Sequence, residues 1–282
     1  MERKETMKVG MLTGPFSNET LDTVIDFAEE VDIPCLEVVA HPGSKHINPS
    51  RLTLARAAKI RQAVAERGIE ITSLAYYADA ADPKKRKAIQ AHAKKTIDAA
   101  AMLGVPTVCM LAGMPVEGLS KIETIRKVLP KVFRPILTHA RRKNVNIALE
   151  NYFRTCLQGI DTFECLFETI PDENFGLNYD PSHLVHQGCD HLLPVSMFGP
   201  RIFHTHAKDT LVDRAKRARV GIYADGWWRY VIPGFGNIDW GEYVSHLRMN
   251  GYDGVLSIEH EDGSQTREEG FARGAWYLEQ FC

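Results

Sequence analysis

Residues 105–150, VPTVCMLAGMPVEGLSKIETIRKVLPKVFRPILTHARRKNVNIALE, contain the pattern on which the fold prediction depends. Two short, mainly apolar runs, Val105–Leu111 and Asn146–Glu150, flank a longer amphipathic segment, Ser120–Lys143. Short β-branched runs are typical of buried strands, and apolar residues at helical spacing are typical of a helix that covers a sheet. The stretch therefore predicts a strand, a crossover helix and a second, parallel strand.

The same alternation extends in both directions along the chain. Six further runs have the composition of strands: Val9–Leu12, Leu36–Ala40, Ile69–Ala75, Phe175–Asp180, Ile202–Ala207 and Val255–Glu259. Helical patterns follow them: Glu19–Glu30, Pro49–Arg67, Pro83–Leu103, Thr162–Ile170, a weak one near His191–Phe198, Trp240–Asn250 and Thr266–Gln280. Eight such units without a Pro-, Gly- or Ser-rich linker predict an α/β fold, a single-domain (β/α)8 TIM barrel over residues 1–282.

A doubly wound open sheet is the alternative for alternating strands and helices. Such a sheet normally has a Gly-rich phosphate-binding turn after its first strand. The turn here, Gly10-Met-Leu-Thr-Gly14-Pro15, does not have that pattern. The barrel is therefore favoured.

Composition excludes several classes of protein. The 34 Lys and Arg residues nearly balance the 36 Asp and Glu residues, which argues against a nucleic-acid partner. No apolar run approaches the roughly 20 residues of a membrane span, and Met1–Gly10 lacks the apolar region of a signal peptide. The six cysteines form no CxxC pair and are expected to be reduced thiols. We expect a soluble, cytoplasmic protein without a membrane partner.

The segment after the seventh predicted strand, about residues 208–236, is much longer than an ordinary βα loop. Its first half is rich in basic residues and its second half in aromatic residues. Two interpretations remain open, a solvated and partly disordered loop or a lid over the substrate.

Four predicted strands in the second half of the chain end in ionisable residues. In a barrel, strand residues alternate between the axis and the helices, and the chemistry collects at the carboxyl ends of the strands. The alternation predicts that His204 and Ile202 share the inward face with the histidine at the end of their strand. The inward-facing residues at the four strand ends are Glu150, Asp180, His206 and Glu259.

Three carboxylates and an imidazole at one barrel mouth would repel one another unless a positive charge lay between them. A single such residue caps a helix or pairs with an arginine in many proteins, but four on consecutive strands favour a divalent metal. An oxygen-rich ligand set suits Mn²⁺, Mg²⁺ or Co²⁺ better than a structural Zn²⁺. We expect Mn²⁺, with Mg²⁺, Co²⁺ and Zn²⁺ as alternatives.

Several motifs around these positions resemble those of a known family. The chain resembles the sugar phosphate isomerase/epimerase group of the xylose-isomerase-like TIM barrels over nearly its whole length. The motifs that carry the resemblance are Ala148-Leu-Glu150-Asn, Asn178-Tyr-Asp180-Pro-Ser-His183, His204-Thr-His206-Ala-Lys208-Asp209 and Leu256-Ser-Ile-Glu259-His-Glu-Asp262.

The resemblance implies roles for particular residues. The ketose 3-epimerases of this superfamily hold one Mn²⁺ or Co²⁺ through Glu, Asp, His and Glu, which implies Glu150, Asp180, His206 and Glu259 as ligands. It also implies that the two glutamates act as acid and base and that His183 contacts the substrate. The sequence departs from the epimerases because no arginine follows His206 closely, and from the apurinic-site endonucleases because no Asp-x-His pair follows it.

The implied activity is that of a metal-dependent sugar isomerase or epimerase, which removes a proton next to a carbonyl through a metal-stabilised enediolate. A lyase or dehydratase acting on a keto-sugar, keto-inositol or 3-keto-glycoside would use the same metal and base. A third hypothesis is a sugar-binding barrel without catalysis. The expected partner is a small sugar or sugar derivative, and a homodimer is compatible with the resemblance.

Six other residues are candidates for substrate contact. Lys208 is expected either to stabilise a developing oxyanion or to form a surface pair with Asp209. Glu37, His41 and Tyr76, at the ends of the second and third predicted strands, are expected to bind substrate hydroxyls or to support the residues that do. Trp227 and its neighbour Trp228 either stack on a sugar face or pack within their own loop.

Overall fold

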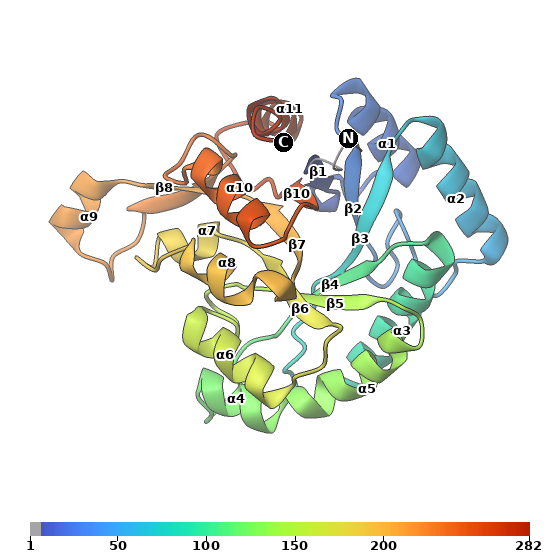
Figure 1. The fold of residues 1–282 in the computed structure, drawn as a ribbon, viewed down its shortest axis with the longest axis horizontal. Coiled ribbons are helices and arrows are strands. Elements are labelled where there is room, and N and C mark those ends of the chain that lie inside the picture. The colour runs from blue at the N-terminus through green and yellow to red at the C-terminus, as the bar shows by residue number, and fades with distance from the viewer. Residues whose placement is uncertain (1–6) are drawn as a thin grey trace.

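Eight parallel strands close into a barrel, and each lies where the sequence predicts a strand (Figure 1). The structure, a computed structural model, describes residues 7–282. Around the barrel the order is β1, β10, β7, β6, β5, β4, β3, β2, with β1 beside β2. The bounds are β1 Lys8–Leu12, β2 Cys35–Val39, β3 Glu70–Tyr76, β4 Thr107–Leu111, β5 Asn146–Glu150, β6 Phe175–Tyr179, β7 Ile202–Ala207 and β10 Val255–Ile258. The (β/α)8 prediction is confirmed.

Helices follow the strands and cover the outside of the barrel (Figure 1). They are α1 Leu21–Glu30, α2 Leu54–Glu66, α3 Arg86–Leu103, α4 Lys121–Lys127, α5 Leu129–Arg141, α6 Ile160–Thr169, α7 Ser182–Val185, α8 Leu193–Phe198, α10 Trp240–Met249 and α11 Arg267–Leu278. Two short 3₁₀ turns are η1 Gly14–Phe16 and η2 Gly199–Arg201. Within residues 7–282, none of the helices combines the length and hydropathy that a membrane span requires.

The single helix predicted over Ser120–Lys143 is two helices in the structure, α4 and α5. Pro130 lies in the first turn of α5 and has no N–H to continue the hydrogen bonds of α4, so the helix restarts there. Ser120 caps α4 in a capping box with Glu123.

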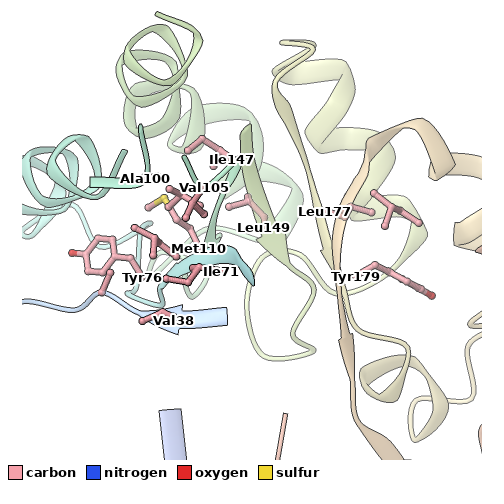
Figure 2. Packing of buried hydrophobic residues seen from close by; sticks show 14 of the residues in the cluster. Val38, Ile71, Tyr76, Ala100, Val105, Met110, Ile147, Leu149, Leu177 and Tyr179 are labelled. Atoms are coloured by element: carbon pink, nitrogen blue, oxygen red, sulfur yellow. The ribbon is translucent and has the colours of Figure 1, made fainter. Parts of the chain in front are cut away.

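The hydrophobic core lies between the strands and the helices. Ile147 and Leu149 on β5 and Leu177 on β6 are fully buried in this layer, together with Met110 and Ala100 (Figure 2). The residues between them in the strands face the barrel axis. This alternation directs the last inward residue of each strand to the carboxyl mouth of the barrel.

One irregularity in β7 changes which residues face the axis. Leu177 of β6 pairs with Ile202 of β7. The next residue of β6 pairs with the residue after Phe203, so Phe203 is an extra, unpaired residue in β7. Ile202 lies with Leu177 in the helix-facing core, so the prediction that it shares a face with His206 is wrong. Gly176 makes room for the bulge, because a Cβ there would lie 2.6 Å from the Phe203 ring.

The long segment after β7 has its own secondary structure. It forms an antiparallel pair, β8 (Asp209–Val212) and β9 (Trp228–Val231), with the short helix α9 (Arg214–Val220) between the two strands. Figure 1 shows α9 projecting at the left, away from the barrel. The first half of the segment is thus ordered in the structure, although α9 has no buried residue and is exposed to solvent, as the first interpretation expects. The structure does not test the second interpretation, a lid over the substrate. We call residues 209–231 the β8–β9 arm.

Candidate active site

The four predicted strand-end residues converge at the carboxyl mouth of the barrel. Each of the four residues offers one possible ligand atom, a carboxylate oxygen or a ring nitrogen, and these four atoms lie within 4.8 Å of one another. The residues are Glu150, Asp180, His206 and Glu259. They come from β5, β6, β7 and β10 or the residue just after these strands, which are neighbours around the barrel. Three of the four residues are buried, and the Glu259 side chain is 15% exposed. Three oxygen ligands and one nitrogen are a donor set that binds a divalent cation.

The orientation of His206 fits a metal ligand. Its Nε2 lies 3.0 Å from an oxygen of the buried Glu37, to which it donates a hydrogen bond. Its Nδ1 faces Glu150 at 3.4 Å and Glu259 at 3.2 Å, and has no hydrogen-bond partner within residues 7–282. An Nδ1 that faces two carboxylates requires positive charge, either a proton on the nitrogen or a cation between the groups, and a carboxylate behind the ring is typical of metal-bound histidines.

The electrostatics of the site favour positive charge. Burial lowers the pKa of His206, but the carboxylates of Glu37, Glu259 and Glu150 outweigh it and raise this pKa well above its usual value. Burial and the neighbouring Glu259 raise the pKa of Glu150. Burial also acts to raise the pKa of Glu259, but Lys208 and His206 hold it well below its usual value. The two glutamates therefore differ in proton affinity, as an acid and a base must.

Lys208 is a buried part of this cluster. Its Nζ lies 2.5 Å from Glu259, 3.2 Å from Asp180 and 3.4 Å from Glu261, and its side chain is 1% exposed. The alternative of a surface pair with Asp209 is wrong, because Asp209 is buried and accepts hydrogen bonds from a different part of the chain.

His183 lies directly beside the cluster. Its Nε2 is 3.4 Å from Glu150, 3.3 Å from Asp180 and 3.4 Å from the Lys208 ammonium. Burial and the positive charge of Lys208 lower the pKa of His183 well below its usual value, so the ring is neutral. Its Nδ1 lies 2.6 Å from the hydroxyl of Tyr230 in the β8–β9 arm.

Two residues predicted to bind substrate lie elsewhere. Glu37 is fully buried behind His206, and its oxygens are engaged by His206, Ser257 and Tyr77. It lies in the middle of β2 rather than at its end, so it supports His206 from below. The ring of His41 packs against Tyr76 at 5.8 Å, and the structure gives it no hydrogen bond to the four residues of the cluster within residues 7–282.

The two tryptophans of the arm have different surroundings. Trp227 is buried within the arm, where its indole N–H donates to Ile222 and Arg217 lies over its ring. Trp228 faces the site and stacks on His186 with a centroid distance of 3.9 Å. The structure thus places Trp228, rather than Trp227, on the site side of the arm.

Sequence reasoning missed Tyr77 and Tyr230. Tyr77 follows β3, and its hydroxyl bonds to Glu37 and lies 3.1 Å from His206. The alternation of side chains along β3 could have identified Tyr77. Tyr76 faces the helices, so the next residue must face the barrel axis. No sequence signal marks Tyr230, because its contact with His183 depends on how the arm folds over the barrel.

A family model described as xylose isomerase-like TIM barrel matches residues 25–281, and the chain belongs to this family of enzymes. The protein YfiH of Bacillus subtilis is 27% identical over 97% of this chain and 99% of its own length. Inosose dehydratase from Geobacillus thermodenitrificans is 30% identical over 126 residues, which cover 43% of this chain and 42% of that enzyme.

Solved structures have the same fold. A xylose isomerase domain protein from Planctomyces limnophilus has a TM-score of 0.77 at 20% identity and covers 99% of this chain and 98% of its own. The IOLI protein, solved with a bound zinc atom, has a TM-score of 0.75 at 22% identity, covering 98% and 99%. The 3-keto-D-glucoside 4-epimerase YcjR from E. coli has a TM-score of 0.74 at 14% identity, covering 97% and 99%.

Proposed function

We propose that this chain is a divalent-metal-dependent isomerase or epimerase that moves a proton next to a carbonyl of a sugar or sugar-like ketone. The observation that carries the proposal is the pair Glu150 and Glu259, which lie on different strands and face the same histidine nitrogen. Because the two carboxylates reach the same point from different strands, one is placed to accept a proton and the other to donate one.

Glu150, Asp180, His206 and Glu259 would hold the metal. Support comes from the donor set and from Nδ1 of His206, which has no hydrogen-bond partner among residues 7–282. When bound, the cation supplies positive charge that polarises a carbonyl oxygen and stabilises the negative charge that develops on it. Mn²⁺ suits this oxygen-rich set, with Mg²⁺, Co²⁺ and Zn²⁺ as alternatives.

The remaining groups bind and orient the substrate in this proposal. His183 and Lys208 present hydrogen-bond donors beside the carboxylates, within reach of substrate oxygens. Trp228 stacks one face of its ring on His186, and its other face is suited to the C–H face of a sugar ring. Removal of a proton by one glutamate and its return by the other from the opposite face gives epimerisation, whereas one glutamate serving both carbons gives isomerisation.

The test is the exchange of substrate hydrogen with D₂O over a panel of keto-sugars and keto-inositols, in the presence of saturating Mn²⁺. We expect Glu150→Gln and Glu259→Gln each to lower the exchange rate by at least ~100-fold, the typical contribution of general acid–base catalysis. Glu164→Gln, an exposed carboxylate on α6, is the matched control and should be unaffected. Full exchange in both site variants would refute the proposal.

Dehydration is the second candidate, favoured by the 30% identity of a 126-residue segment to an inosose dehydratase. It begins with the same proton abstraction, and His183 or Lys208 would then protonate the departing hydroxyl. Mass spectrometry of the products separates the two candidates. Exchange of hydrogen for deuterium without loss of water supports the isomerase, and loss of water supports the dehydratase.

A further inference from the structure

The end of the β8–β9 arm that lies farthest along α9 exposes apolar side chains to solvent. Val220, Ile222 and Tyr223 are 43%, 64% and 98% exposed, and they lie within four positions of one another. α9 itself has no buried residue, and it projects away from the barrel (Figure 1). Apolar side chains that gather on one surface are typical of a contact with another molecule. We call these three residues the arm tip.

Positive charge lies directly before the arm tip. α9 contains four basic residues, and none of them forms an ion pair with a carboxylate within residues 7–282. They are Arg214, Lys216, Arg217 and Arg219. A surface that matches the arm is therefore concave and apolar and has carboxylates of its own that lack a basic partner.

The chain has a cavity with these properties. The cavity has a volume of about 520 Å³ and lies between the start of α6 and the turn that joins α7 to α8. Its lining is mainly apolar and includes Ile160 and Leu193, of which Leu193 is 46% exposed. Asp161 and Asp190 also line it, and neither pairs with a lysine or arginine in the part of the chain that the structure describes. We call it the α6–α8 cavity.

The arm of the same molecule does not fill this cavity, because α9 extends outward from the barrel (Figure 1). In that view α6, α7 and α8 lie on the same side of the barrel as α9, so one neighbouring molecule can meet both surfaces. A second copy of the chain carries both an arm tip and a cavity. Two-fold symmetry lets the arm of each copy reach the cavity of the other, so that both pairs of surfaces are covered at once.

We propose that the arm tip of one copy docks in the α6–α8 cavity of a second copy, and that the chain forms a two-fold dimer with two reciprocal contacts. In each contact Ile222 and Tyr223 pack against Leu193. The basic residues of α9 then lie beside Asp161 and Asp190. The inference goes beyond the proposed activity and does not depend on it, because association is measured without a substrate.

Sedimentation velocity over a concentration series of the full-length protein tests the proposal. The wild type should be a dimer. A tip variant, Ile222→Asp with Tyr223→Asp, and a cavity variant, Leu193→Asp, should each raise the dissociation constant of the dimer at least ~30-fold, the effect of losing a central apolar contact. A wild-type protein that stays monomeric throughout the series would overturn the proposal.

Leu54→Asp is the matched control, because Leu54 is 72% exposed on α2, at the opposite side of the barrel (Figure 1). It should leave the dissociation constant unchanged. The variants replace exposed side chains, and far-UV circular dichroism checks that each remains folded. Dimers as tight in the tip variant as in the wild type would contradict the proposal.

A mixture of the two variants tests whether the tip and the cavity are partners of each other. The cavity variant has an intact tip and the tip variant has an intact cavity, so a mixed dimer keeps one of the two contacts, whereas neither variant alone keeps any. The mixture should therefore associate more tightly than either variant by itself. A mixture that dissociates as readily as the separate variants would show that these surfaces do not bind each other.

Salt gives an independent measurement. The attraction between α9 and the two aspartates is screened by ions, so the dissociation constant of the wild-type dimer should rise with the NaCl concentration. A dimer whose stability is independent of NaCl contradicts the role of the charges. A monomer that binds a DNA duplex through α9 would assign the basic residues to a nucleic acid and would also overturn the proposal.

Discussion

A single buried carboxylate, Glu37, controls the orientation of the candidate metal-binding histidine. It accepts hydrogen bonds from His206 and Ser257 at 3.0 Å and from Tyr77. Burial acts to raise the pKa of Glu37, but His206 and His204 lower it to about 2, so it is charged at neutral pH. Its charge keeps the proton of His206 on Nε2 and leaves Nδ1 free to face the other carboxylates.

We therefore predict that Glu37→Gln lowers the affinity for Mn²⁺ by about 10- to 100-fold, the usual effect of removing the partner of a metal-bound histidine. Calorimetric titration with Mn²⁺ measures it. His41→Gln, at the end of the same strand but outside the cluster, is the control and should retain wild-type affinity. Equal affinities in Glu37→Gln and the wild type would show that Glu37 does not support the site.

At the scale of elements, the β8–β9 arm is anchored to the barrel by Asp209. Both oxygens of this buried carboxylate accept hydrogen bonds, at distances of 2.7 to 3.2 Å. The donors are the backbone N–H groups of Thr210, Gly234, Gly236, Asn237 and Ile238 and the indole N–H of Trp240. A single side chain thus joins the beginning of the arm to the segment that leads into α10.

Replacement of Asp209 by asparagine should destabilise the protein, because the amide group presents N–H donors where the carboxylate accepts hydrogen bonds. We expect Asp209→Asn to lower the free energy of unfolding by about 3 kcal/mol, the upper range for leaving buried polar groups unpaired. Urea unfolding measures this change. Asp225→Asn, an exposed carboxylate in the same arm, serves as the control and should change the stability by less than ~0.5 kcal/mol. A stable Asp209→Asn protein would mean that the arm is held by its other contacts alone.

For the whole molecule, the cluster of buried carboxylates links metal binding to stability. Like charges held together at the barrel mouth oppose folding, and a cation that binds only the folded chain stabilises it by mass action. Binding at 100 times the dissociation constant contributes about 2.7 kcal/mol. For a chain of 282 residues, this corresponds to a rise in Tm of roughly 5 °C.

Mn²⁺ should therefore raise the Tm, and a chelator should lower it again. Differential scanning calorimetry with and without Mn²⁺ measures the shift, and Asp180→Asn should remove most of it. A Tm that is independent of Mn²⁺, or a shift that persists in Asp180→Asn, would count against these ligands.

The alternation of residues along each strand was sufficient to predict much of the site. Glu150 and Asp180 each lie two positions after another inward-facing residue of the same strand. Because successive side chains of a strand point to opposite faces, both are directed to the barrel axis once the strand is recognised. The same rule failed for Ile202, because the extra residue Phe203 shifts the alternation at that point. A bulge of this kind depends on the neighbouring strand, where Gly176 leaves the space for it.

The sequence alone determined the eight strand–helix units and the four strand-end residues, because these follow from periodicities within a few residues. Only the tertiary structure decided which residues surround them. Glu37 and His206 are 169 positions apart, and His183 and Tyr230 are 47 apart. Contacts at such separations are set by closure of the barrel and by the path of the arm over its mouth, and no local pattern encodes either one.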